Sequence, residues 1–441
     1  LLHSLDDVFR KLDKFDDKHR KEPASVKKLL QGDACWGTRK LVLGWIIDTI
    51  QMTLELPAHR KDRLLELLHA IPPTQQRISV KKWQQVLGEF RSMAIAIPGS
   101  RGLFSLLQEA LRHKSDGRIR LSCGVHDTLA DFLWLAQDLS SRPTRLFEIV
   151  PQPSPELVGA QDASGRGMGG VWFPASNALL ERPASGSAAK HLPSTGPLLW
   201  RARFDADVSK DLVTFENPTG AITNSDLELA ASVVQHDVAA HAFDVRERTI
   251  ASGSDNTPTV AWQRKGSTTT TSAPAYLLRV QALHQRFHQY YSSAFFVPGT
   301  LNAMADDCSR LWTLSDEQLL SRFDLTYPQA ASWRLATPRP AMLSSVTSAL
   351  HKHRPAPESF LHAPVPTTAP GASGPVFARI SWSTLGSPTC PTQSYSYRCL
   401  PNAIAQASLP PVSGLSSLER WRAPSAQWVR PLRAWGLQTL A

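Results

Sequence analysis

The chain has 441 residues, of which 42% are hydrophobic and 20% charged, and its formal net charge at pH 7 is +10. This length and composition predict a globular protein of two or three domains and exclude a fibrous one. No apolar run approaches the roughly 20 residues of a membrane-spanning helix, so we expect no membrane partner. The five cysteines show no C-x-x-C spacing, which predicts neither a zinc site nor disulfides and favours an intracellular protein of the cytoplasm or nucleus.

The first 146 residues predict helices and a pair of strands. Apolar residues recur at helical spacing from Leu1 to Phe15, which predicts an amphipathic helix with Asp6 and Asp7 on its polar side. A polymerase places its paired aspartates on a strand hairpin, so we assign these two acids no catalytic role. The elements that follow are expected to be two strands around a turn, at 39–48 and 52–57, and helices at 58–71, at 80–113 with a break at 97–102, and at 126–141.

Strands dominate from about residue 147. After a short strand at 146–150, the pattern predicts five strands, at 157–164, 167–173, 197–205, 248–256 and 292–299. Helices are predicted at 224–243, 273–291 and 301–312. The order β-β-β-α-β-α-β-α predicts the α/β class, with a mixed five-stranded sheet covered by flanking helices.

Acidic residues lie within or at the ends of these elements, namely Asp162, Glu228, Asp255 and Asp306. Two of them also have a structural explanation. Ser225 and Glu228 match an S-x-x-E capping box, and Asp255 precedes a helix that Pro258 could begin. A cap does not explain Asp162, because a lone carboxylate inside a buried strand is costly to desolvate.

Carboxylates that converge in a buried site repel one another unless cations neutralise them. Ligation by oxygen alone is what Mg²⁺ and Mn²⁺ prefer. Two such ions held about 4 Å apart can activate a water and stabilise the leaving oxygen of a phosphodiester. The four acids therefore predict a site for two Mg²⁺ or Mn²⁺ ions.

Four segments, "DASGRGMGGVWF", "NSDLELAA", "SDNTPTVAW" and "GTLNAMADDCSRLW", resemble the acidic motifs of a retroelement-type ribonuclease H, in that family's order. The resemblance implies a ribonuclease H-like fold, with catalytic and metal-binding roles for Asp162, Glu228, Asp255 and Asp306. Asp306 is preferred to Asp307 because the family pattern N-x-x-A-D begins at Asn302. DNA-cutting transposases and integrases of the same fold use the order D-D-E, which argues against that activity.

Upstream, "KLVLGWIIDTIQMTLELPAHR" resembles the primer grip and thumb of a reverse transcriptase, and "LLHSLDDVFRKL" resembles the helix after its catalytic hairpin. Together, residues 1–330 are similar to the polyproteins of DIRS-like or Ngaro-like retrotransposons. The polymerase palm and its Y-x-D-D motif are missing. We therefore expect no DNA polymerase activity from this chain alone, and a longer polyprotein could supply the palm as a partner.

Many enzymes of this family carry a histidine shortly before the last aspartate, and "VPGTLN" offers none. His284 and His288 fall on the preceding predicted helix, and we expect both on the surface. The resemblance implies that the missing histidine slows product release without abolishing cleavage.

Three regions follow. Residues 1–146 are expected to be a palm-end, thumb and connection remnant of a reverse transcriptase, and 147–320 a ribonuclease H-like domain. Residues 321–441 are expected to form a basic Pro/Ser/Ala-rich tail, mostly disordered. Within it, residues 331–441 hold ten Lys or Arg against two acids, and 15 of the 33 prolines. Such a tail can hold polyanions through phosphate contacts or can be a solvated linker.

These observations predict a hydrolase, a metal-dependent endonuclease that cuts the RNA strand of an RNA–DNA hybrid. Basic residues of the front part could contact the duplex backbone or form a solvated face, namely Lys81, Lys82, Arg91 and Arg101. The alternative is a decayed transposon fragment that folds or binds nucleic acid without catalysis. The missing palm favours the fragment, and the four acids favour the enzyme.

Overall fold

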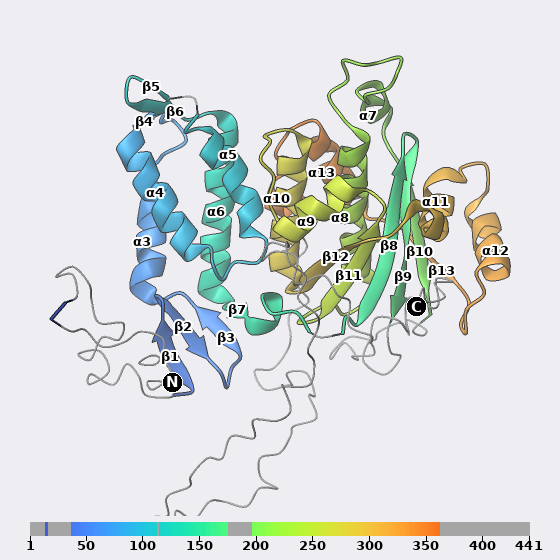
Figure 1. Ribbon diagram of the computed structural model, residues 1–441, viewed down its shortest axis with the longest axis horizontal. Helices are drawn as coiled ribbons and strands as arrows, with labels where there is room; N and C mark the ends of the chain where they lie inside the picture. The colour runs from blue at the N-terminus through green and yellow to red at the C-terminus, as the bar shows by residue number, and fades with distance from the viewer. Residues whose placement is uncertain (1–13, 16–36, 113, 153, 175–195, 362–441) are drawn as a thin grey trace, which may run out of the picture. The chain divides into compact units, whose positions relative to one another are not determined.

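The computed structural model describes residues 14–15, 37–112, 114–152, 154–174 and 196–361 (Figure 1). The predicted helix at 1–15, with Asp6 and Asp7, lies outside these residues except for a turn at Lys14 and Phe15. The predicted tail beyond Leu361 also lies outside them. No helix of the described residues is long and apolar enough to cross a membrane.

Residues 37–150 contain helices and two small antiparallel sheets, with strand orders β1-β2-β3-β7 and β4-β6-β5. Their elements are β1 (Arg39–Val42), β2 (Trp45–Asp48), β3 (Thr53–Glu55), α3 (Ala58–His69), β4 (Arg77–Ser79), α4 (Val80–Met93), η1 (Ser100–Leu103), α5 (Phe104–Glu109), β5 (Lys114–Ser115), β6 (Arg118–Arg120), α6 (Cys123–Ser141), β7 (Thr144–Arg145) and η2 (Leu146–Glu148).

The segment 39–48, predicted as one strand, is a hairpin of β1 and β2. Leu43 and Gly44, the two residues between the strands, have φ angles of 49° and 80°. Positive φ at both central positions is the mark of a type I′ turn, whose twist suits a two-residue hairpin. The strand predicted at 146–150 is also different, because η2 forms there as a short 3₁₀ helix.

Residues 154–174 and 196–361 build a larger α/β unit. Its elements are β8 (Leu157–Ser164), β9 (Gly167–Pro174), β10 (Leu198–Arg203), α7 (Ala206–Lys210), α8 (Asn224–Ala242), β11 (Thr249–Ser254), α9 (Thr257–Lys265), α10 (Ala273–His288), β12 (Tyr291–Phe296), η3 (Gly299–Leu301), α11 (Ala303–Arg310), α12 (Asp316–Thr326), β13 (Arg334–Ala336), α13 (Pro340–Leu350) and α14 (Pro357–Phe360).

The sheet of this unit has the strand order β12-β11-β8-β9-β10-β13. Strands β8, β9 and β10 form an antiparallel meander, while β11 runs parallel to both β8 and β12. The five predicted strands are therefore present in one mixed sheet. A sixth, β13, adds in parallel to β10, and its three residues are too few to show a period in the sequence.

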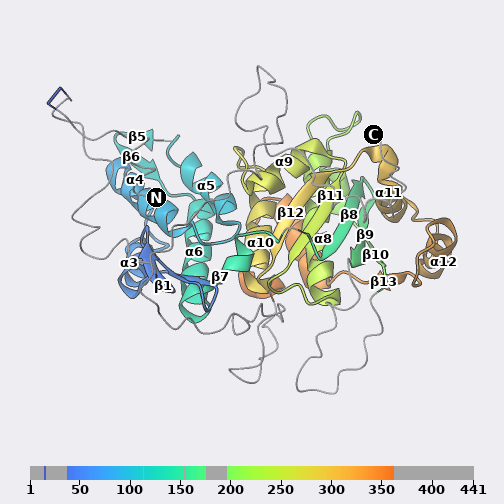
Figure 2. The same cartoon turned by 60° about the horizontal axis from the view of Figure 1, so that its bottom comes forward.

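Helices cover both faces of the sheet, with α8 and α10 on one side and α11 on the other (Figures 1 and 2). The glycines of β9 permit this close approach. A Cβ on Gly169 would lie 2.5 Å from the Cβ of Cys308 in α11, and one on Gly170 would lie 2.6 Å from Gln235 Oε1 in α8. The sequence "GMGG" therefore sets helix-to-sheet spacing on both faces.

The ordered chain extends beyond the predicted boundary at residue 320, which falls inside α12. Residues 321–361 are described as α12, β13, α13 and α14, so the expectation of disorder from 321 is wrong for this part. Helix α13 buries Met342, Val346, Ala349 and Leu350 at helical spacing. The sequence does not reveal this short apolar stripe, because the surrounding proline, serine and alanine residues are typical of a disordered segment.

Met342→Ala should therefore lower the free energy of unfolding by about 2–5 kcal/mol, because the Met342 side chain is fully buried and its removal leaves a cavity. Urea denaturation of the full chain measures this. Ser344→Ala, an exposed position on the same helix, is the control and should change stability by less than about 0.5 kcal/mol. Equal stability of Met342→Ala and wild type would mean that α13 does not pack on the core.

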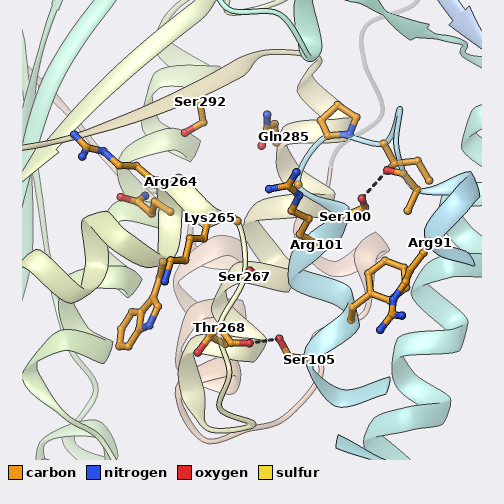
Figure 3. A pocket seen from close by; sticks show the side chains of 18 of the residues that line it. Arg91, Ser100, Arg101, Ser105, Arg264, Lys265, Ser267, Thr268, Gln285 and Ser292 are labelled. Atoms are coloured by element: carbon orange, nitrogen blue, oxygen red, sulfur yellow. Dashed lines mark hydrogen bonds between the residues drawn. The ribbon is translucent and has the colours of Figure 1, made fainter. Parts of the chain in front are cut away.

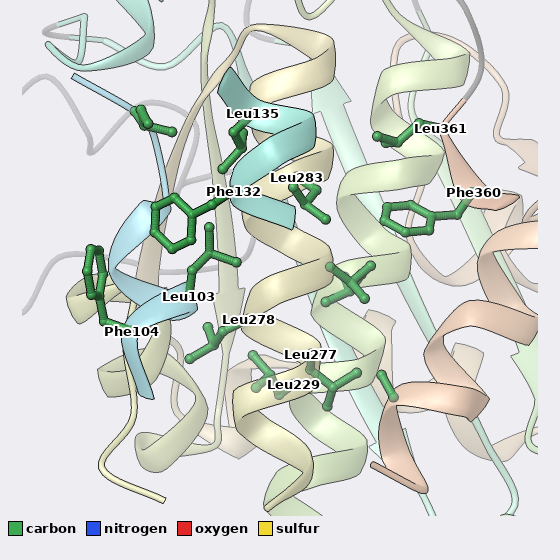
Figure 4. Close-up of a cluster of buried hydrophobic side chains, with 14 of the residues drawn as sticks. Leu103, Phe104, Phe132, Leu135, Leu229, Leu277, Leu278, Leu283, Phe360 and Leu361 are labelled. Carbon is green, nitrogen blue, oxygen red and sulfur yellow. The ribbon is translucent and has the colours of Figure 1, made fainter. Parts of the chain in front are cut away.

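The front part and the α/β unit share one apolar cluster. Leu103 of η1 and Phe132 of α6 lie beside Leu278 and Leu283 of α10 (Figure 4). Because these residues come from both parts, the described residues up to Leu361 form one compact unit.

Buried ion pairs join α6 to α10. Asp131 of α6, fully buried, accepts hydrogen bonds from Arg279 Nη2 at 2.9 Å and from Arg354 Nη2 at 2.8 Å. Further along α10, Arg286, also fully buried, pairs with Asp138 at 2.7 Å and with Glu148 at 3.2 Å. Both of these buried guanidinium groups of α10 thus meet a carboxylate of the front part.

Candidate metal centre

Three of the four predicted acids come together. Asp162 on β8, Glu228 on α8 and Asp255 just after β11 each offer a carboxylate oxygen within 4.8 Å of the others. Asp162 is 1% exposed and Glu228 2% exposed, while Asp255 is half-buried. Parallel pairing of β8 with β11 and the packing of α8 on β8 bring three distant chain segments to one point.

The capping explanations do not hold for two of these acids. Helix α8 is capped by Thr223, whose hydroxyl oxygen accepts from the Asp226 N–H, while Asp226 Oδ2 accepts from the Thr223 N–H at 2.7 Å. Glu228 is therefore outside the capping box. Helix α9 is capped by Asn256, so Asp255 caps neither helix. The carboxylates of Glu228 and Asp255 therefore have no capping role and are available as metal ligands in the acidic group.

Neighbouring hydroxyls hold the two buried carboxylates in place. Ser309 of α11 donates its hydroxyl to Asp162 Oδ2, and Ser254 of β11 donates to Glu228 Oε2 at 3.4 Å. Neither serine was singled out in the sequence, because a serine next to an acid in space leaves no pattern along the chain.

Asp306 lies at the margin of the group. Its side chain is 43% exposed, and Arg310 Nε contacts Asp306 Oδ1 at 2.7 Å and Asp162 Oδ2 at 3.8 Å. The neighbouring Asp307 accepts from Tyr327 Oη at 3.0 Å and pairs with Arg322 at 3.2 Å. Asp306 thus shares the guanidinium group of Arg310 with Asp162, whereas Asp307 pairs with Arg322 and Tyr327, outside the acidic group.

The acidic group is electrostatically strained. Burial, with the nearby charge of Asp255, raises the pKa of Asp162 to about 6. Burial and the charges of Asp162 and Asp255 raise the pKa of Glu228 to about 9. Burial also raises the pKa of Asp255. Such shifts mean that the fully ionised group costs free energy, which a bound cation would offset.

Stability of the metal-free protein should fall as the pH rises from 7 to 9. In this range the native Glu228 still binds a proton that the unfolded chain, with a pKa of 4.5, has lost. The native state therefore binds more protons, and ∂ΔG/∂pH for unfolding is negative. The buried histidines do not contribute, because the pKa values of His236 and His284 are lowered by burial and their linkage lies below pH 6.5.

Thermal unfolding in chelator from pH 7 to 9 measures this effect. Glu228→Gln removes the titrating group, so its midpoint should decline less steeply than that of wild type. Identical slopes for the two proteins would show that Glu228 ionises as freely in the native state as in the unfolded chain.

A second feature is a cavity of about 810 Å³ lined by residues of α4, η1, α5, α9 and the loop after α9 (Figure 3). Its lining includes the predicted contacts Arg91 and Arg101, together with Arg264 and Lys265, which the sequence analysis missed. Lys81 and Lys82, at the start of α4, do not line it. Two of the four predicted basic residues, Arg91 and Arg101, therefore line the cavity.

His284 and His288, which we expected on the surface, are instead wholly or partly buried. His284 is 1% exposed, and one nitrogen of His288 is buried. Helix α13, which the sequence analysis did not predict, packs against α10 and covers this region. The surface expectation is therefore wrong for His284 and wrong in part for His288.

Fold and site together define a mixed α/β protein with a six-stranded sheet and an acidic group that could hold a metal ion. No protein-family model and no curated protein matches the sequence. Among solved structures, it is similar to foamy viral protease-reverse transcriptase in complex with RNA/DNA hybrid, with 11% identity and a TM-score of 0.24 over 59% of this chain and 29% of that one.

The same viral enzyme in complex with dsDNA gives 12% identity and a TM-score of 0.24, over 59% of this chain and 45% of that one. The chain therefore spans less than half the length of these proteins. A similarity with a TM-score of 0.24 and 11–12% identity is too low to assign a fold or a function to this chain.

Proposed function

We propose that this protein is a metal-dependent endonuclease with a ribonuclease H-like domain that cuts the RNA strand of RNA–DNA hybrids. The observation that carries the proposal is the convergence of Asp162, Glu228 and Asp255 from three separate elements. Their order along the chain, Asp-Glu-Asp with a further Asp306, matches the family that the motifs resemble. The helices on both faces of a β-β-β-α-β sheet support the same fold.

The donor set fits divalent Mg²⁺ or Mn²⁺. It consists of carboxylate oxygens, the ligands that these hard cations prefer, and the pKa values of Asp162 and Glu228 are raised by burial and by the neighbouring carboxylates, which a bound cation would counteract. Asp162, Glu228 and Asp255 would hold the metal, with Asp306 as the exposed fourth ligand. Two such ions, when bound, would activate water and neutralise the leaving oxygen.

The chain's own residues orient this centre. The Ser309 hydroxyl fixes one oxygen of Asp162 and leaves the other for ligation. Arg310 is 57% exposed, so its side chain can swing away from Asp162 and Asp306 when a cation arrives. Without metal, its guanidinium partly offsets the repulsion between the carboxylates.

Hybrid cleavage by the full chain tests the proposal. With Mg²⁺ or Mn²⁺ present, the protein should cut labelled RNA in a hybrid and spare the DNA strand and duplex DNA. Chelator should stop cleavage. Wild type without cleavage at any metal concentration would favour the alternative, a decayed transposon fragment without catalysis.

Residues up to 146 would be the thumb and connection remnant of a reverse transcriptase, and the ribonuclease H-like domain would start at 147. A longer polyprotein would supply the palm. The described elements α12, β13, α13 and α14 extend the folded region beyond 320, at least to Leu361.

Nucleic-acid binding should depend on the basic cavity. Arg91 and Arg101 line it and are exposed, so their guanidinium groups can reach phosphates. Arg91→Gln/Arg101→Gln should weaken hybrid binding and reduce the slope of log K against log[salt] by about 2, since each phosphate contact contributes about 0.9.

Lys81→Gln/Lys82→Gln is the matched comparison, because it removes the same charge from outside the cavity. We expect it to change the salt slope less. Fluorescence anisotropy at several salt concentrations measures both. Equal slopes for the two double variants would mean that the cavity has no special role in binding.

A further inference from the structure

Four residues of metal-binding type face one another between α8 and α10, away from the acidic centre. Asp237 and His241 are four residues apart on α8, and His284 and His288 are four residues apart on α10. Positions i and i+4 lie on the same face of a helix. Asp237 is nine residues, about 13 Å of helix, from Glu228, so this is a separate cluster.

The distances suit a common ligand. Asp237 Oδ1 lies 3.2 Å from His284 Nε2 and 3.6 Å from His241 Nδ1, but His241 Nδ1 is closer to the backbone oxygen of Asp237, at 2.8 Å. The rings of His284 and His288 have centroids 4.3 Å apart. Asp237, His284 and His288 offer ligand atoms that all lie within 4.8 Å of one another. Zinc–nitrogen bonds of about 2.0–2.1 Å place two tetrahedral donor atoms about 3.4 Å apart, so a small closure completes the geometry.

One donor atom of the cluster is buried without a partner. His288 Nε2 has no hydrogen bond with any described residue, and burial lowers the pKa of His288, which keeps the ring neutral. A buried polar atom left unsatisfied costs free energy. One nitrogen of the His288 ring lies within 4.8 Å of a carboxylate oxygen of Asp237 and a nitrogen of His284, and a neutral imidazole in such a group is what a metal ion of the zinc class binds.

The surrounding contacts orient the first ligands. His284 Nδ1 lies 3.0 Å from the hydroxyl of Tyr290, which is fully buried. When Nε2 binds a metal, its proton moves to Nδ1, which then donates to Tyr290. Arg339 of α13 donates Nε to Asp237 Oδ2 at 3.1 Å, and this bond fixes the carboxylate. Outer contacts of this kind set the tautomer and direction of metal ligands.

Arg339 also affects which metal ion the site can bind. Its Nη2 donates to Asp237 Oδ1, so a metal would share or take over that oxygen. The nitrogen ligands carry no charge and do not compete with Arg339. This arrangement favours a borderline cation that bonds to imidazole and disfavours Mg²⁺ or Ca²⁺, which need several carboxylate or carbonyl oxygens.

We propose that Asp237, His284 and His288 form a three-ligand site for a Zn²⁺-class transition-metal ion, which leaves the fourth position for water. The bound ion joins α8 to α10 and stabilises the helical layer against the sheet. The site uses no cysteine, which is why the cysteine spacing gave no sign of it. The inference is independent of the nuclease proposal, because it concerns different residues and a different metal.

Metal binding by the full chain, stripped with chelator, tests the proposal. Co²⁺ titration followed by visible absorption should show one saturable site with the intense bands of a four-coordinate ion, and Zn²⁺ should displace it. Zn²⁺ should also raise the unfolding temperature, because a ligand that binds only the native state stabilises it.

His288→Phe keeps a ring of similar size and removes the buried nitrogen. Loss of an outer-shell partner already weakens metal binding by about 10–100-fold, so loss of this ligand should weaken it by about 100-fold or more. His353→Ala, at an exposed position, is the matched control and should bind as wild type does. Glu228→Gln should also bind as wild type does, because it changes only the acidic centre.

Failure of wild type to bind Zn²⁺ saturably would overturn the proposal. So would His288→Phe binding as tightly as wild type, or loss of the Co²⁺ bands in Glu228→Gln. If His288→Phe does not fold, X-ray absorption of zinc-loaded wild type decides the matter. Imidazole ligands with nitrogen at about 2.0 Å support the site, and a shell without imidazole overturns it.

Discussion

Asp162→Asn should reduce cleavage of the RNA strand by about 100-fold or more. The substitution keeps the size of the side chain and its contact with Ser309, but it removes the most central negative charge of the acidic group. Loss of one strong transition-state contact costs about 3–4 kcal/mol, which corresponds to this factor. Single-turnover cleavage of a labelled hybrid with Mg²⁺ or Mn²⁺ measures it.

The same substitution should leave stability in chelator equal or higher. Burial and the charge of Asp255 disfavour the ionised Asp162, and a neutral asparagine side chain removes that cost. Asp306→Asn is the graded comparison. Its carboxylate is 43% exposed and lies outside the close group of three, so we expect a smaller loss of cleavage. A larger loss than in Asp162→Asn would place the centre of the chemistry at α11.

Asp131→Ala should lower the free energy of unfolding by about 3–5 kcal/mol. The substitution removes the carboxylate shared by Arg279 and Arg354 and leaves Arg279, 2% exposed, as a buried cation without its ion-pair partner. An uncompensated buried charge costs about this much. Chemical denaturation of the full chain measures the change.

Asp207→Asn is the control for this effect. Asp207 pairs with Lys210 on the surface, with both side chains at least 75% exposed, and such pairs contribute about 0–1 kcal/mol. A loss of less than about 1 kcal/mol in Asp131→Ala would mean that Arg279 finds solvent or another partner, and that α6 and α10 are joined mainly by apolar contacts.

The front part and the α/β unit should unfold together. The sequence predicted a thumb and connection remnant beside a separate nuclease domain. Asp131 and Asp138 of the front part neutralise arginines of α10, so unfolding of one part exposes unpaired charges in the other. We therefore expect a single unfolding transition for the described residues, and not two.

The sequence alone was sufficient for the main elements of the sheet and for the acids that meet there. Strands β8 to β12 have strong apolar runs bounded by turn residues, and the helices α8 and α10 are long. Asp162 stood out because an acid inside a buried strand needs a partner. Local pattern carries this information, since the period of a strand or helix is written in neighbouring residues.

Only the tertiary structure decided the neighbours of those acids and showed that the chain remains folded beyond residue 320. Ser309 and Arg310 reach Asp162 across 147 and 148 positions of sequence, and His288 meets Asp237 across 51. Helix α13 has a short apolar stripe that is buried because α10 lies beside it. Contacts of this kind arise from packing between distant segments, and a single sequence records the residues but not which of them will meet.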